Sequence, residues 1–172
     1  MMMKTQPVYH AFTYKFPGHV FRLTTQVTIT DAQGRKSSGQ ALWDTGASVS
    51  CISKPVVAAL GLKPTGQRRV LTPHGYAQAG TYLVNIALPE DGGDSGFTVF
   101  DVEVCDSYIE KQGFSALIGM DIITMGDFAV SHSKTGDTIF SFCLPPRRAI
   151  DYSLEVWVER RTGKDCIVNS LE

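Results

Sequence analysis

Residues 41–48 read Ala-Leu-Trp-Asp-Thr-Gly-Ala-Ser, and this stretch decides how the rest of the chain is interpreted. An apolar run leads into a carboxylate, Asp44, and the chain then turns at Thr45 and Gly46. Because Gly46 has no Cβ, another backbone segment can approach it closely, and the Thr45 hydroxyl can lock the turn by a hydrogen bond to the backbone. The pattern predicts a rigidly held carboxylate at the end of a strand. Asp-Thr-Gly alone is weak evidence, because an ordinary strand-end turn uses the same residues.

The residues before Asp44 predict a hairpin. Apolar and polar residues alternate over 21–30, which is typical of a half-buried strand. A turn over 31–34 and a second strand over 35–43 then lead to Asp44. Further strands are expected over 69–88 (two arms around a bend at 73–75), 97–104, 117–118, 128–130, 138–142 and 154–158.

The sequence predicts helical structure in only two short segments. Ser53, Pro55 and Gly61 bound a short helix over 54–60, and residues 121–125 can form one or two helical turns. No long helical period occurs, and short strands recur along 172 residues, a length typical of one domain. The fold class expected from the residues is therefore all-β, either a barrel or a sandwich.

The composition argues against several classes of partner. Lys and Arg total 16 against 17 Asp and Glu, so the net charge is -1. A protein that binds phosphates by charge normally has a basic excess, so neither nucleic acid nor a membrane surface is expected as a partner. No apolar run could span a bilayer and no secretory signal is recognisable at the N-terminus, so we expect a cytoplasmic location.

The cysteines and histidines predict no metal site. Cys51, Cys105, Cys143 and Cys166 form no Cys-x-x-Cys pair, and the four histidines do not cluster in the sequence. We expect four reduced thiols, most of them buried, and no bound metal.

A second motif follows at residues 116–123, Ala-Leu-Ile-Gly-Met-Asp-Ile-Ile, where an apolar pair precedes Gly119. Each motif is of moderate specificity by itself. Their order along the chain, with a glycine-bearing hairpin around Gly75 between them, resembles the retropepsins, the single-domain aspartic proteases of retroviral type. The resemblance covers the chain from Phe21 to Phe142.

The resemblance implies a single-domain closed β-barrel with a flap hairpin and one short helix, active as a homodimer. Since each chain has one Asp-Thr-Gly, Asp44 from each subunit would form the catalytic dyad. Two carboxyl groups about 3 Å apart share one proton. The ionised one activates a water that attacks the scissile carbonyl, and the protonated one donates to the carbonyl oxygen. The implied protein is an aspartic endopeptidase that cuts extended peptide or protein substrates and needs no cofactor.

Other positions take roles through the same resemblance. The Thr45 hydroxyl would reach the partner's turn, the Gly46 carbonyl would bind the substrate backbone, and Gly119 would pack beside the catalytic loop. Ala47 completes this supporting set. The residues expected at the flap, over the substrate, are Pro73, His74, Gly75 and Tyr76.

The resemblance also divides the chain. We interpret residues 1–20 as an N-terminal extension, 21–143 as the protease domain and 144–172 as a C-terminal extension. Apolar residues alternate with Glu and Trp over 154–158, which we interpret as a strand that could contribute to a dimer interface.

The sequence departs from the viral pattern at two coupled positions. Ser48 stands where the viral enzymes have an aspartate, and Met120 stands where they have an arginine. Those two residues pair as ions near the dimer interface. Since both are replaced here, no unpaired charge is left, and the dimer needs another source of stability.

Three residues in or beside the motifs are interpreted as structural. Trp43 is expected to pack in the core, and Cys51 is expected to be a buried, inert thiol. Asp121 follows Gly119 at the start of a helix, so it is expected to cap that helix instead of acting as a second catalytic carboxylate.

Two other functions stay open at this point. The chain could be a catalytically weak retropepsin-like module for dimerisation or peptide binding. It could also be a structural β domain in which Asp-Thr-Gly is accidental. Retention of Asp44, Thr45 and Gly46 together favours the protease.

Overall fold

A computed structural model describes residues 7–72, 75–91 and 96–162 of the chain. Pro73 and His74, which are expected at the flap, and Cys166 lie outside the described residues.

Six strands close into a barrel. In hydrogen-bonded order they are β2 (Leu23–Thr30), β3 (Lys36–Trp43), β8 (Ala116–Ile118), β4 (Cys51–Ser53), β7 (Phe97–Ser107) and β6 (Gly75–Leu88). β2 pairs with β6 as well as with β3, and this second pairing closes the sheet on itself. β3 and β8 run parallel, as do β4 and β7, while the other neighbours are antiparallel. The expected closed all-β barrel is confirmed.

The strand before Asp44 shows why the barrel forms from this sequence. Val27 and Ile29 of β2 are buried, and Thr28 between them is only half-buried. On β3, Ala41 and Trp43 are buried, while Leu42 is only half-buried. Alternate residues of a strand lie on opposite faces, so this pattern places one face of the hairpin in the core.

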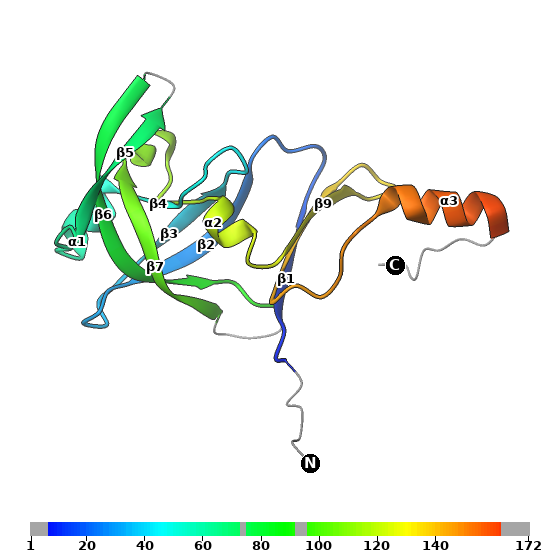
Figure 1. Cartoon of the computed structure of the whole chain (residues 1–172), viewed down its shortest axis with the longest axis horizontal. Coiled ribbons are helices and arrows are strands. Elements are labelled where there is room, and N and C mark those ends of the chain that lie inside the picture. Colours follow the sequence, from blue (N-terminus) through cyan, green and yellow to red (C-terminus); the bar gives the residue numbers. More distant parts are fainter. Residues whose placement is uncertain (1–6, 73–74, 92–95, 163–172) are drawn as a thin grey trace, which may run out of the picture.

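A hairpin projects from the barrel. β5 (Gly66–Thr72) pairs antiparallel with the first half of β6, and the pairing reaches Thr72 opposite Gly75. Gly75 has φ of 108°, a backbone conformation that glycine adopts without strain. Figure 1 shows this hairpin standing away from the body of the molecule. The two extended arms expected around residues 73–75 are therefore present.

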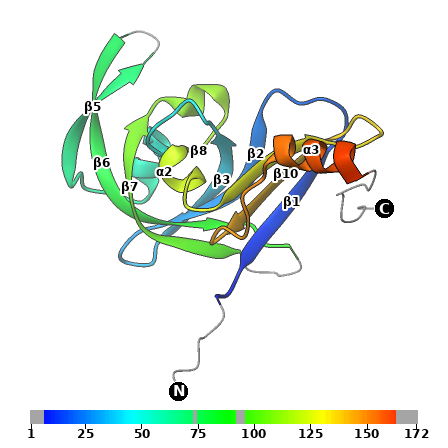
Figure 2. The same cartoon turned by 45° about the vertical axis from the view of Figure 1, so that its right-hand side comes forward.

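A second sheet lies beside the barrel (Figure 2). It contains β1 (His10–Phe16), β10 (Thr138–Leu144) and β9 (Asp127–His132), in that order. Trp43 packs into it with ring centroids 5.0 to 6.1 Å from those of Phe12, Phe128, Phe140 and Phe142. Its indole N–H donates to the Thr25 hydroxyl at 3.0 Å. Trp43 is thus a core residue, as expected, and it fixes the end of β3. The sheet includes part of residues 1–20, since β1 pairs with β10 along its length.

Three α-helices and one 3₁₀ helix complete the described chain: α1 (Lys54–Ala59), η1 (Ile109–Gln112), α2 (Met120–Ile123) and α3 (Tyr152–Thr162). α1 and α2 lie where the sequence predicts helical turns. No helix in the described part of the chain is long and apolar enough to cross a membrane.

The strand expected over 154–158 is wrong, because these residues belong to α3. Alternation over five residues is too short to distinguish the two structures, and a strand here would have needed a sheet to join. The helix satisfies its own backbone, and the Asp151 carboxylate accepts a hydrogen bond from the Leu154 N–H at 3.0 Å at its start. That bond, together with one from the Ser153 hydroxyl, lowers the pKa of Asp151. α3 has no buried residue and extends beyond β9 (Figure 1).

Asp31 holds the turn between β2 and β3, and it gives a test of the fold. Burial tends to raise the pKa of Asp31, but hydrogen bonds from Arg35 and Gln33 and the charge of Arg35 outweigh burial, so the pKa lies below 3.8. The charged form is therefore favoured in the folded state, and its contribution to stability is present above pH 3.8 and lost as the pH falls through the lowered pKa.

We expect Asp31→Asn to lower the free energy of unfolding at pH 7. The difference from wild type should shrink in urea titrations near about pH 3. An equal difference at both pH values would contradict this assignment.

Candidate functional site

Asp44 lies directly after β3, at the point where β3 and β8 end together. Its backbone N–H donates to the Ile118 carbonyl at 2.9 Å, so β8 holds the residue in place. Its Oδ1 accepts from the Gly46 N–H at 2.8 Å, and its carbonyl accepts from the Ala47 N–H at 3.2 Å. The side chain is half-buried. The result is a carboxylate held rigidly within its own turn.

The residue after Asp44 faces solvent. Thr45 is exposed, and its hydroxyl has no hydrogen-bond partner within the described residues. The sequence allowed a hydrogen bond from the Thr45 hydroxyl to the backbone of its own turn, and this bond is not formed. The hydroxyl is therefore available to a group outside this chain.

Gly119 packs against the Asp44 turn from the second motif. A Cβ at Gly119 would lie 2.9 Å from the Ala47 carbonyl oxygen and 2.8 Å from the Val49 carbonyl carbon, so any larger residue would force the backbone apart. The next residue, Met120, donates its N–H to the Ala47 carbonyl at 2.8 Å. The structure thus brings together the two motifs that lie far apart in the sequence.

Ser50 joins the two motifs, and the sequence interpretation missed it. It is completely buried, and its hydroxyl accepts from the Gly119 N–H at 3.0 Å and donates to Asp121 Oδ1 at 2.7 Å. Its N–H donates to Asp121 Oδ2 at 2.8 Å. The available signal was a serine inside an apolar run, since a buried hydroxyl needs partners. Asp121 therefore binds Ser50, which corrects the expectation that it serves chiefly as a helix cap.

A half-buried apolar surface begins beside Asp44. Leu42 of β3 is paired with Leu117 of β8, and Leu117 is paired with Cys51 of β4. All three are half-buried, whereas Trp43 and Ile118 point into the core. Leu42 and Asp44 are two residues apart, so they share a face of the sheet. The surface can receive an apolar side chain close to the carboxylate.

The Cys51 thiol is inert in this setting. Burial, and then the nearby Cys105, Asp121, Asp106 and Asp44, raise its pKa to about 12. The nucleophilic form of a cysteine is the thiolate, so Cys51 is unsuited to nucleophilic catalysis at neutral pH.

The thiol can be tested by alkylation. We expect iodoacetamide at pH 8 to modify Cys51 at least about tenfold more slowly in the folded protein than in urea, because the raised pKa keeps it protonated. Peptide mapping by mass spectrometry measures the site separately from the other cysteines. Equal rates in the folded and unfolded protein would contradict the assignment.

The hairpin of β5 and β6 has apolar and aromatic side chains near its end. Tyr76 is 65% exposed, and Leu71 is paired with it across the hairpin. The guanidinium of Arg69 lies 3.8 Å from the centroid of the Tyr76 ring. Of the expected flap residues, Gly75 and Tyr76 are described, and both lie on this hairpin.

The two departures from the viral pattern leave uncharged side chains at positions 48 and 120. Ser48 is exposed, and Met120 packs against the hydrophobic core. Within the described ranges, no group of three or more His, Cys, Asp or Glu side chains could hold a metal ion.

Comparison with known proteins gives a family match over the same region. A family model described as aspartyl protease matches residues 25–122, which include both motifs. No curated protein matches the sequence.

Several solved structures resemble the fold at low identity. The retropepsin-like aspartic protease from Rickettsia conorii has 12% identity and a TM-score of 0.48, over 81% of this chain and 98% of that one. The simian foamy virus protease has 20% identity and a TM-score of 0.41, over 59% and 92%. The foamy viral protease–reverse transcriptase, solved with an RNA/DNA hybrid, also has 20% identity and a TM-score of 0.41. That match covers 58% of this chain but only 11% of the viral one.

Proposed function

Because the chain belongs to the aspartyl protease family, we propose that it is a homodimeric aspartic endopeptidase in which Asp44 of each subunit forms the catalytic dyad. The observation that carries the proposal is the position of Asp44. It is a half-buried carboxylate at the end of β3, fixed by Ile118 and Gly46, and it lies inside the family match.

The hydrogen bonds that Asp121 accepts support a dyad made from two chains. Asp121 belongs to the second motif, beside the turn, and both of its oxygens accept hydrogen bonds from Ser50. It is therefore committed to holding the loop, and one chain supplies half of a dyad. In the proposed dimer, the exposed Thr45 hydroxyl would bind a second copy of the turn.

The proposed chemistry follows from pairing two identical carboxyl groups. At about 3 Å they share one proton, because two charges at that distance repel strongly. The ionised Asp44 removes a proton from a water, which attacks the scissile carbonyl. The protonated Asp44 donates to the carbonyl oxygen, which gives a tetrahedral gem-diol. As the C–N bond breaks, the Asp44 that took the water proton gives it to the leaving amine, and a hydroxyl of the gem-diol returns a proton to the other Asp44.

The substrate we propose is an extended peptide with an apolar side chain at the scissile bond. Leu42, Leu117 and Cys51 form the surface that would receive this side chain. The hairpin of β5 and β6 would close over the peptide with Gly75 and Tyr76 near its end, and main-chain hydrogen bonds would hold the peptide as an added strand. The assignments at Pro73 and His74, the boundaries at 21 and 143 and the cytoplasmic location stay predictions.

Inhibitor binding and turnover test the proposal together. A pepstatin-type inhibitor should bind the full chain, and a library of extended peptides should be cut at apolar positions. Binding without turnover would favour a peptide-binding module. Neither binding nor turnover, in a protein shown to be dimeric, would overturn the proposal.

The pH dependence is a further test. Since the dyad needs one proton, hydrolysis should follow a bell-shaped curve with its maximum on the acid side of neutrality. Initial rates on one peptide between about pH 3 and pH 9 measure it. A rate that rises steadily up to pH 9, or that a chelator abolishes, would indicate a different mechanism.

A further inference from the structure

Arg22 lies at the same end of the hairpin of β2 and β3 as Asp44. It directly precedes Leu23, which is paired with Trp43, and Asp44 directly follows Trp43. Arg22 is exposed, so its side chain lies on the outside of the barrel. On β3 the residue that faces outward at this end is Leu42, which belongs to the half-buried apolar surface beside Asp44. A cation therefore lies at the edge of that surface.

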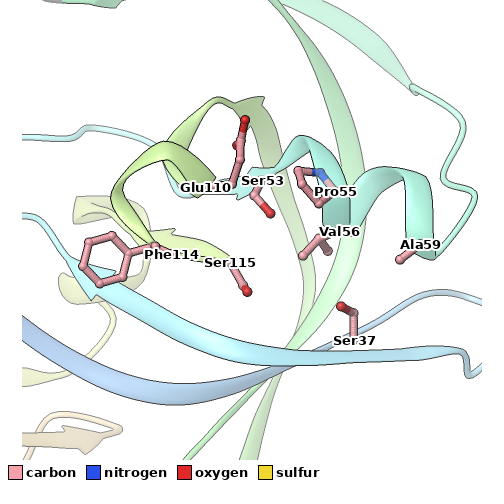
Figure 3. Close-up of a pocket in the computed structure, with 9 residues that line it drawn as sticks. Ser37, Ser53, Pro55, Val56, Ala59, Glu110, Phe114 and Ser115 are labelled. Atoms are coloured by element: carbon pink, nitrogen blue, oxygen red, sulfur yellow. The ribbon is translucent and has the colours of Figure 1, made fainter.

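The Arg22 side chain is directed across β3. Its guanidinium lies 6.0 Å from the centroid of the Phe114 ring. Phe114 precedes β8, and β3 lies between β2 and β8 in the sheet, so the two side chains approach each other across β3. Figure 3 shows the Phe114 ring turned away from the hydroxyls of Ser37 and Ser115. Since Leu42 lies on the outer side of β3, the guanidinium and the ring together bound the apolar surface.

The charge of Arg22 is not neutralised by the rest of the chain. Its guanidinium makes no ion pair with Asp44 or with any other carboxylate in the described parts of the chain, and it donates no hydrogen bond there. The neighbouring Leu42 and Phe114 are apolar. An arginine in this setting favours a ligand that presents a carboxylate next to an apolar side chain.

We propose that Arg22 determines specificity, and that the preferred substrates carry an acidic side chain two positions from the apolar residue at the scissile bond. Side chains two positions apart in an extended peptide lie on the same face, roughly 7 Å from each other. A peptide whose apolar side chain lies on Leu42 would thus bring the carboxylate toward the Arg22 guanidinium. The inference rests on the proposed function, because it names the substrate class of the Asp44 site. The two-fold axis of the proposed dimer gives one Arg22 on each side of the scissile bond.

Two matched peptides test this inference on the full chain. Both have the same apolar pair at the scissile bond. The residue two positions from each member of that pair is glutamate in one peptide and glutamine in the other. We expect kcat/KM to be at least about fivefold higher for the glutamate peptide. Because the attraction acts between exposed charges, the ratio of the two values should fall in about 0.5 M salt.

Variants assign the preference to Arg22. Arg22→Gln should lower the ratio to less than about twofold, and Arg22→Lys should keep part of the preference because it keeps the charge. Arg160→Gln on α3 makes the same change of charge at another exposed arginine and should keep the wild-type ratio. Since the ratio compares two substrates of one enzyme, any loss of folded or dimeric protein in a variant cancels.

The outcomes separate this inference from the proposed function. Equal cleavage of the two peptides by wild type, or an unchanged ratio in Arg22→Gln, would show that Arg22 does not select the substrate, while the proposed proteolysis would stand. Competition of the peptides with a pepstatin-type inhibitor gives the same comparison without turnover. If neither peptide is cut and the inhibitor does not bind, the proposed function fails and the inference fails with it.

Discussion

An Asp44→Asn variant is expected to fold and dimerise like wild type and to lose at least about a thousandfold in peptide hydrolysis. The amide has nearly the same shape as the carboxylate, and its oxygen can still accept the hydrogen bond from Gly46. It cannot take a proton from water, so the dyad loses its base. Initial rates at the pH optimum measure the loss, and circular dichroism with sedimentation checks the fold and the dimer.

A matched control separates chemistry from a general effect of the amide. Asp101 is exposed and has φ of 54°, a conformation that asparagine tolerates. Asp101→Asn should therefore leave the rate unchanged. Hydrolysis by Asp44→Asn within tenfold of wild type would show that Asp44 is not the catalytic group.

The second large effect is expected from α3. An isolated helix of 11 residues is marginal in water, and α3 exposes Leu154 and Trp157 by 56% and 51%. Ser48 and Met120 leave the dimer without the viral ion pair, so we expect a second subunit to cover this apolar surface. Removing residues 149–172 should raise the dimer dissociation constant at least tenfold, which corresponds to about 1.4 kcal/mol.

Removal of residues 149–172 leaves the rest of the subunit intact. Asp127 accepts hydrogen bonds from the N–H groups of Arg147 and Arg148, so truncation after Arg148 preserves this anchor to β9. The double variant Leu154→Ser with Trp157→Ser should weaken the dimer in the same direction, while the exposed Arg160→Ser should not. Sedimentation at several concentrations measures each constant. A truncated chain that dimerises as tightly as the full chain would show that α3 has another role.

Much of the barrel could be predicted because its signals are local. Alternation along β2, followed by a turn and a second strand, identified the hairpin that leads to Asp44, and the two ordered motifs identified the family. The placement of Gly119 beside Ala47 followed from the resemblance, and the steric need for a glycine there became visible only with the backbone in place.

The features that were missed depend on long-range contacts or on short ambiguous patterns. Residues 154–158 alternate like a strand over too few residues to exclude a helix, and in the structure they belong to α3. The sequence around Ser50 shows only a hydroxyl among apolar residues, and its partners, Gly119 and Asp121, are identified only by their position in space. The pairing of β1 with β10 joins segments that are far apart in the sequence, and no local pattern predicts it.

The most direct test of the shared dyad is a subunit-mixing experiment. Wild-type and Asp44→Asn chains are unfolded together in equal amounts, refolded, and assayed at constant total protein. If each active site needs Asp44 from both subunits, only dimers of two wild-type chains are active, and activity falls to about one quarter of that of the unmixed wild type. Activity of about one half would show that each chain works alone, and it would contradict the account.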